Sequence, residues 1–179
     1  MKSLNSFIGE HLTWVQPKAI KHDYELRDQS EVYGRLVFPK SFGTLAEIES
    51  AEGKWTLKRV GFIHTSVTIR EDGKEENVGV FKPSGWGSRG TLELTSGKKY
   101  EWKLENFWAT RFEIKDSSGN TVIKYQSGKD DSNISDMFKN QARVSFTEQA
   151  RNLPELSQLI LIGWYLIVMI QMDSVVGVA

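Results

Sequence analysis

Six residues of this chain have the spacing of a dinucleotide-binding loop. Gly85, Gly87 and Gly90 fit the pattern Gly-x-Gly-x-x-Gly. In that chemistry a strand precedes the loop and a helix follows it, so that the helix N-terminus meets the pyrophosphate. Residues 91–94 (Thr-Leu-Glu-Leu) instead alternate between polar and apolar side chains, as a strand does. The pattern therefore predicts a glycine-rich turn between two strands, and we expect no nucleotide cofactor.

Basic side chains surround this turn. Lys82 precedes the glycines, Arg89 lies between Gly87 and Gly90, and Lys98 and Lys99 follow in the next predicted turn. Ammonium and guanidinium groups that gather at one edge of a protein bind phosphate and other anions. We therefore name these four residues as a candidate anion-binding rim. The alternative is that all four are ordinary solvated charges.

The other reactive side chains show no catalytic or metal-binding spacing. The histidines, His11, His22 and His64, do not have metal-ligand spacing. Residues 131–136 (Asp-Ser-Asn-Ile-Ser-Asp) faintly resemble a calcium loop, but the glycine at its sixth position and the distal glutamate are missing. The chain has no cysteine, which excludes disulfides, thiolate metal sites and a cysteine nucleophile. We expect a protein that is not an enzyme and holds neither a metal nor a cofactor.

Length, charge and the N-terminal residues narrow the class of protein. A chain of 179 residues is expected to form one domain. Lys and Arg together number 23, as do Asp and Glu, so the sequence lacks the basic excess that is typical of nucleic-acid binders. The first ten residues lack the apolar core of a signal peptide. We expect a cytoplasmic protein with no nucleic-acid partner.

From residue 12 to residue 148, apolar and polar side chains alternate with a period of two, which predicts strands. Turn residues interrupt the alternation, among them Gly53, the pairs 72–73 and 96–97, and residues 118–120. Roughly ten to twelve short strands at this spacing predict an antiparallel sandwich or barrel.

Two stretches within this region carry specific expectations. Residues 62–69 alternate throughout and are expected to form a strand, with Phe62 and His64 on one face and Ile63 on the other. In that position His64 is a structural residue rather than a base. Residues 127–140 are polar and are expected to form a loop or an irregular excursion.

The last thirty residues predict a buried helix. Residues 159–170 read Leu-Ile-Leu-Ile-Gly-Trp-Tyr-Leu-Ile-Val-Met-Ile, without a charge or a polar face. A helix that is apolar all round is buried on all sides. Asn152, Pro154 and Glu155 form a helix start, so we expect a helix over residues 152–172. Such a helix is about 30 Å long, which matches the height of a barrel built from strands of about eight residues.

A transmembrane span is the competing interpretation of this helix. The uncharged apolar run has 12 residues, whereas a span needs about 20. No basic cluster flanks the run. A barrel of about twelve strands is too wide for its own side chains to fill, so it needs an apolar plug. The sequence therefore predicts a mainly β protein, a closed antiparallel barrel of about twelve strands threaded by the C-terminal helix, with no transmembrane span.

An internal repeat predicts that the barrel has two similar halves. Residues 24–28 (Tyr-Glu-Leu-Arg-Asp) and residues 112–116 (Phe-Glu-Ile-Lys-Asp) match in class at every position, at an offset of 88 residues. Trp14 and Trp102 share this offset. We expect a pseudo-twofold axis to relate the two units and to place both tryptophans in equivalent positions.

These features resemble the tubby C-terminal-like superfamily, which includes tubby proteins, phospholipid scramblases and LURP-one-related proteins. The resemblance rests on the strand–turn–strand units 24–38 and 112–125 and on the helix 159–170. It implies a closed twelve-stranded barrel around a C-terminal helix. From tubby proteins it also implies binding of phosphoinositide head groups, although none of the tubby head-group residues can be matched to positions here. A scramblase would bring acylated cysteines and a calcium-binding segment, and this chain has no cysteine and no complete calcium loop.

Two functions are expected from these observations. The first is a non-enzymatic module that binds anionic phospholipid head groups at a membrane surface through Lys82, Arg89, Lys98 and Lys99. The second is a protein-interaction or scaffold domain that has no small-molecule ligand. A deep polar pocket would favour the first function over the second.

Overall fold

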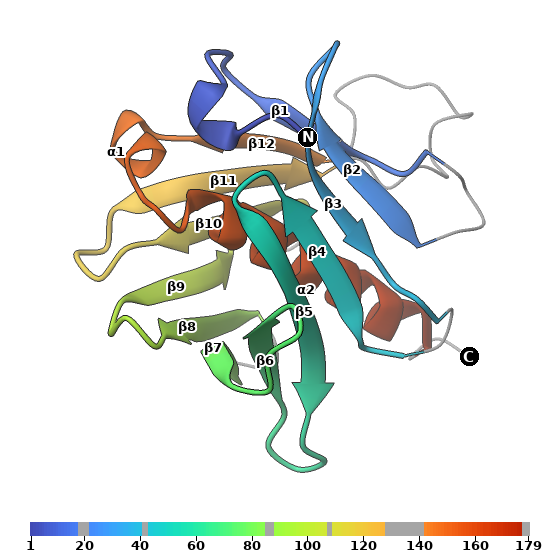
Figure 1. Ribbon diagram of the computed structural model, residues 1–179. Coiled ribbons are helices and arrows are strands. Elements are labelled where there is room, and N and C mark those ends of the chain that lie inside the picture. Colours follow the sequence, from blue (N-terminus) through green and yellow to red (C-terminus); the bar gives the residue numbers. More distant parts are fainter. Residues whose placement is uncertain (18–21, 41–42, 85–87, 107–108, 128–141, 177–179) are drawn as a thin grey trace.

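The computed structural model describes the whole chain except residues 18–21, 41–42, 85–87, 107–108, 128–141 and 177–179. Twelve strands close into one antiparallel barrel, in which each strand pairs with its neighbours in the chain and β12 pairs with β1 (Figure 1). The strands are β1 (Leu12–Val15), β2 (Asp23–Arg27), β3 (Val32–Val37), β4 (Ala46–Ser50), β5 (Gly53–Val60), β6 (Ser66–Glu71), β7 (Asn77–Ser84), β8 (Arg89–Leu94), β9 (Lys99–Leu104), β10 (Arg111–Lys115), β11 (Thr121–Ser127) and β12 (Ala142–Phe146).

Three helical elements complete the fold: a short 3-10 helix, η1 (Leu4–Ser6), and two α-helices, α1 (Glu148–Arg151) and α2 (Leu156–Val176). The closed barrel, the strand number and the apolar C-terminal helix that the sequence predicts are thereby confirmed. The polar stretch 127–140, expected as a loop, lies almost wholly outside the described residues.

In the barrel wall, the residues that alternate with a period of two point in turn towards the interior and towards the outside. In β8, Gly90, Leu92 and Leu94 are buried, and the residues between them face outward. Burial of alternate apolar side chains fixes the register of a strand, because a slip by one residue would expose all of them.

Helix α2 lies inside this ring and contacts its wall on several sides. Trp164 stacks on Trp14 of β1 with ring centroids 5.5 Å apart. The hydroxyl of Tyr165 donates to the carbonyl oxygen of Thr44 at 2.7 Å. The hydroxyl of Tyr125 in β11 donates to the carbonyl oxygen of Ile160 at 3.0 Å. The apolar side chains of α2 from 159 to 169 are at most 6% exposed, which is the burial that their composition predicts.

One glycine allows the helix to lie this close to the wall. A Cβ atom at Gly163 would lie 2.2 Å from the hydroxyl oxygen of Tyr125 and 2.6 Å from its ring carbon Cζ. Any side chain at this position would push α2 away from β11, so the glycine inside an otherwise large and apolar run has a packing role.

By length and composition, α2 could cross a membrane over Leu156–Ser174, but 78% of its most apolar stretch is buried inside the molecule. The barrel wall surrounds α2 with the apolar side chains that a helix without a polar face requires. The interpretation as a core helix accounts for α2 without a bilayer.

The start of the helix differs from the expectation. Asn152 does not cap α2; it ends α1, whose own N-cap is Thr147, with a side chain that accepts from the N–H of Ala150. The chain then turns at Pro154, and α2 begins at Leu156. Thr147 followed by Glu148 is also a helix-start signal. Because it comes earlier in the chain, residues 148–151 form a separate helix.

The two sequence repeats fold into equivalent pieces of wall, β1–β3 and β9–β11. Trp14 pairs with Leu26, and Trp102 pairs with Ile114. A β-bulge directly follows Leu26 in the first unit and Ile114 in the second. Both tryptophans are buried, at 0% and 2% exposure, so they occupy matching places in their units.

The relation between the units is not the expected half-turn. In the ring of twelve, β9 lies eight strands after β1, whereas a twofold axis along the barrel would carry β1 onto β7. The repeat covers only three strands in each unit, and the five strands β4–β8 separate them on one side. The pseudo-twofold axis is therefore wrong for these units, although their internal register matches.

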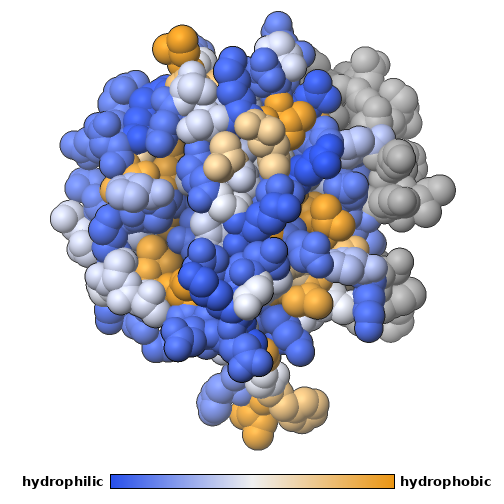
Figure 2. Space-filling model, viewed as in Figure 1, coloured by the Kyte–Doolittle hydropathy of each residue, from blue (hydrophilic) through white to orange (hydrophobic). Residues whose placement is uncertain are grey.

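The expected strand over residues 62–69 is wrong in its first half. Residue Gly61 has a φ of 90°, which favours glycine, and β6 begins only at Ser66. The chain between them forms a loop, and its tip carries Phe62 at 100% and Ile63 at 84% exposure. Figure 2 shows apolar atoms at the end of this loop, which projects at the bottom of the view. We call Phe62 and Ile63 the apolar tip.

Replacement of Leu161 by Asp tests whether α2 is the core of the barrel. Leu161 is fully buried, and an unpaired carboxylate there costs several kcal/mol of a total stability of about 5–15 kcal/mol. We expect Leu161→Asp, and a chain that ends at Ala150, to lose the cooperative thermal transition in circular dichroism. The control is Ile8→Asp at a residue that is 94% exposed, which should change stability by less than about 0.5 kcal/mol. A native-like melt of the truncated chain would contradict the core-helix account.

Candidate binding site at the barrel mouth

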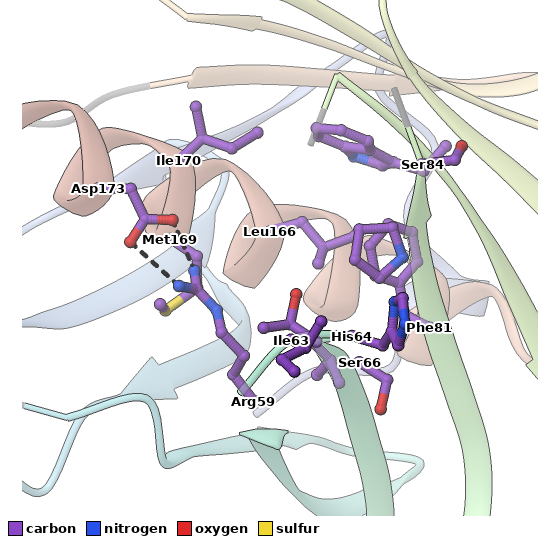
Figure 3. Close-up of a pocket in the computed structure, with 14 residues that line it drawn as sticks. Arg59, Ile63, His64, Ser66, Phe81, Ser84, Leu166, Met169, Ile170 and Asp173 are labelled. Atoms are coloured by element: carbon purple, nitrogen blue, oxygen red, sulfur yellow. Dashed lines mark hydrogen bonds and ion pairs between the residues drawn. The ribbon is translucent and has the colours of Figure 1, made fainter. Parts of the chain in front are cut away.

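A cavity of about 510 Å³ opens at the end of the barrel where α2 finishes (Figure 3). Four pieces of chain surround it: the last turns of α2, the β5–β6 loop, the end of β7, and the inward face of β9 at Trp102. A volume between about 300 and 1,000 Å³ is usual for small-molecule sites.

The floor of the cavity is apolar. Its residues include Phe81, Trp102, Leu166, Met169 and Ile170. The first four are at most 6% exposed, and Ile170 is half-buried. Phe81 stands edge-on to Trp102 with ring centroids 6.1 Å apart. This surface fits a hydrocarbon group.

The rim of the cavity is polar. The two terminal nitrogens of the Arg59 guanidinium bind the two carboxylate oxygens of Asp173 at 2.8 and 3.1 Å, and so join β5 to the end of α2 (Figure 3). His64, Ser66 and Ser84 also line the opening. Donors and acceptors at the rim above an apolar floor are the arrangement of a site for an amphipathic ligand.

The cavity exists because α2 fills the barrel unevenly. The two aromatic side chains of the helix both face the first repeat unit: Trp164 packs on Trp14 and Tyr24, and Tyr165 stacks on Phe38 at 5.8 Å. On the side that faces β6, β7 and β9, the helix presents Leu166, Met169 and Ile170, which are slimmer than Trp or Tyr. There Trp102 stacks on Phe112 of the wall, at 5.3 Å, instead of on a helix ring.

The four nominated basic residues lie on β7, β8, β9 and the β8–β9 turn, but they do not gather in one place. Lys82 and Lys99 bind opposite oxygens of Glu93, at 2.7 and 3.1 Å. Hydrogen bonds and attraction from the two ammonium groups lower the pKa of Glu93, led by the bond from Lys82. This outer-face cluster has two cations and one anion, so much of its positive charge is neutralised locally.

Lys98 lies at the far end of the barrel and binds Glu155 at 2.8 Å, directly before α2 begins. Tyr100 donates its hydroxyl proton to the same carboxylate. Burial on its own would raise the pKa of Glu155, but the bonds from Lys98 and Tyr100 outweigh burial, and the pKa lies below its ordinary value. Lys98 therefore helps to hold the start of the helix.

Arg89 lies on the strand beside the cavity rim. It is exposed at the first position of β8, and it pairs across the sheet with Ser84 of the cavity rim. The glycine-rich turn expected to gather all four residues, Gly85 to Gly87, lies outside the described residues. Residues 91–94 continue as strand β8, which confirms that no helix follows the glycines.

Sequence reasoning missed the cavity. Its rim residues Arg59, His64 and Asp173 come from separate parts of the chain and share no motif. One local signal was present: Gly61 in a run that otherwise alternates as a strand, since an isolated glycine in a strand often marks an irregularity. His64 was expected on a strand face, and it instead lies exposed in the loop at the mouth.

A second hollow, of about 960 Å³, runs along the outside of the barrel between residues 6–11 and the β2–β3 turn. One of its two carboxylates, Asp28, accepts backbone N–H bonds from Ser30 and Glu31 at 2.8 Å each. These bonds, with a further one from Tyr33, lower the pKa of Asp28 to about 2. The residue is occupied in shaping a turn, so we favour the cavity at the mouth as the candidate site.

No group of three or more His, Asp or Glu side chains among the described residues could hold a metal ion.

Comparison with known proteins finds no matching family model, no matching curated protein and no matching solved structure. The resemblance to the tubby-like barrels therefore stays a prediction from architecture, and it assigns no role to any residue of this chain.

Replacement of Glu155 by Gln tests the contact that holds the start of α2. Because the pKa of Glu155 in the folded chain lies below the ordinary 4.5, its charged contacts stabilise the fold above pH 4.5 and are lost as the pH falls through the folded pKa. We expect Glu155→Gln to lower the free energy of unfolding by about 1–2 kcal/mol at pH 7, and by much less at pH 3, in urea titrations. Glu76→Gln, at an exposed turn residue, is the control, and an equal loss for Glu155→Gln at both pH values would contradict the prediction.

Proposed function

We propose that this protein is a non-enzymatic module that attaches reversibly to an anionic membrane surface, with the apolar tip entering the interface. The observation that carries the proposal is the exposure of Phe62 at 100% and Ile63 at 84% on a loop that projects from the barrel beside the cavity. Leu45, at 43% exposure directly before β4, adds apolar surface on the neighbouring connection.

The free energy of this contact suits reversible attachment. Transfer of one Phe or Ile side chain out of water contributes about 1.5–3 kcal/mol, so the tip supplies roughly 3–6 kcal/mol before orientational costs. Each Lys or Arg close to an anionic surface adds about 1 kcal/mol. Lys58 is exposed on β5 near the tip, and Arg89 lies beside the cavity rim. Together, the apolar transfer of the tip and the attraction of these basic residues give weak, salt-sensitive binding to the membrane.

The three nominated lysines fit this role less well, because each of them is paired with a carboxylate. Lys98 is bound to Glu155, and Lys82 and Lys99 share Glu93. A carboxylate beside a lysine reduces the attraction of that lysine to an anionic surface. We therefore assign Arg89 the largest share among the four nominated residues.

Vesicle co-sedimentation tests the proposal. We expect the native chain to sediment with vesicles of phosphatidylcholine containing about one third phosphatidylglycerol, more weakly with phosphatidylcholine alone, and less as salt rises. The double variant Phe62→Ser/Ile63→Ser should lose most of this binding. The matched control is Ile8→Ser, because Ile8 is 94% exposed and lies near α1, at the opposite end of the barrel.

A second pair of variants separates the roles of the basic residues. Arg89→Ala should weaken sedimentation with the anionic vesicles by itself, and the fourfold Ala variant at Lys82, Arg89, Lys98 and Lys99 should not weaken it much further. If the native chain binds neither kind of vesicle, or if the tip variant binds as the native chain does, the membrane proposal is wrong. The exposed tip would then favour a protein-interaction or scaffold domain.

A further inference from the structure

We infer that the cavity at the barrel mouth binds one hydrocarbon chain of an anionic single-chain amphiphile, such as a free medium-chain or long-chain carboxylate. This inference goes beyond membrane attachment, because filling the cavity requires no bilayer.

The size and lining of the cavity support a hydrocarbon occupant. This space measures about 510 Å³, opens to solvent at the barrel mouth, and is walled by Phe81, Trp102 and Leu166 at its inner side. Water in contact with such a floor finds few hydrogen-bond partners, so an apolar chain that displaces it gains the free energy of apolar burial.

The shape of the space follows from the uneven packing of α2. Trp164 and Tyr165 fill the side of the first repeat unit, and Met169 and Ile170 leave the opposite side open. The open space lies between one helix face and the wall formed by β6, β7 and β9. One hydrocarbon chain laid along this helix face contacts Leu166, Met169 and Ile170.

The rim favours an anionic head group. Arg59 uses two terminal nitrogens on Asp173, and a guanidinium carries five N–H donors in total, so donors remain for a ligand oxygen. Arg89 lies across the sheet from Ser84 of the rim. The lining itself carries one guanidinium, Arg59, and one carboxylate, Asp173, with the hydroxyls of Ser66 and Ser84 as further donors.

The decisive probe is decanoate, titrated calorimetrically into the full chain below its micelle concentration. We expect saturable binding of one decanoate per chain with a negative heat-capacity change, the mark of apolar burial. Decyltrimethylammonium, which offers an apolar chain of the same length with a cationic head group, should bind about tenfold more weakly or worse, since charge-assisted hydrogen bonds at the rim are absent. Equal affinity of the two amphiphiles would overturn the anionic part of the inference.

Two matched variants locate the bound chain. Met169→Trp fills the cavity from the helix side and should lower decanoate affinity at least about tenfold. Met172→Trp, one turn further along α2 and outside the cavity lining, should leave the affinity unchanged. Thermal melts of both variants show whether they fold. If Met169→Trp does not fold, the comparison of head groups on the native chain still decides the inference.

Two further measurements ask whether the bound hydrocarbon belongs to a single-chain amphiphile or to a lipid, and whether cavity binding is independent of membrane attachment. Dihexanoyl phosphatidylglycerol, a soluble lipid with two chains, should bind more weakly than decanoate; tighter binding of this lipid would overturn the single-chain assignment. Phe62→Ser lies outside the cavity lining, so it should weaken vesicle binding and leave decanoate binding intact. Absence of saturable decanoate binding to the native chain would refute this inference whatever the vesicles show.

Discussion

The burial of α2 inside the barrel is the interaction on which the rest of the structure depends. A twelve-stranded ring is too wide for its own side chains to fill, and about ten large apolar side chains of the helix contribute roughly 15–30 kcal/mol before conformational entropy is subtracted. Ion pairs fasten the helix at both ends, through Lys98 and Glu155 at its start and through Arg59 and Asp173 near its end. We therefore expect the wall and its filler to unfold as one cooperative unit.

The candidate site is a consequence of how this filler is shaped. A single helix of unequal side chains cannot fit a ring evenly, and here both of its aromatic residues, Trp164 and Tyr165, face the β1–β3 side. Gly163 brings the helix close to Tyr125 of β11. Space is left where the helix presents Leu166, Met169 and Ile170 towards Phe81 and Trp102, and the ion pair at the end of the helix borders it. Core packing and the proposed ligand binding thus have a common origin.

The sequence could predict the elements because their signals are local. The period of two indicated the strands, and the uniformly apolar run 159–170 indicated a helix that had to be buried. The predictions that failed depended on a second local signal that competed with the first, or on contacts between residues far apart in the sequence. Thr147 is the N-cap of a separate helix that ends at Asn152, so Asn152 does not cap α2. Gly61, with a positive φ, begins a loop within a run that alternates as a strand does. The cavity joins residues as far apart as Arg59 and Asp173, and a basic cluster in the sequence could not reveal that Glu93 and Glu155 would lie beside it.

Native-state amide hydrogen exchange tests the central claim, that α2 is the shared core of one cooperative barrel. The helix amides between Leu159 and Met169 should exchange only through global unfolding, with the same apparent free energy as the most protected strand amides and the same dependence on low concentrations of denaturant. Exchange of these helix amides at a free energy several kcal/mol below that of the strands would contradict the account. It would mean that the barrel stays closed while the helix leaves it.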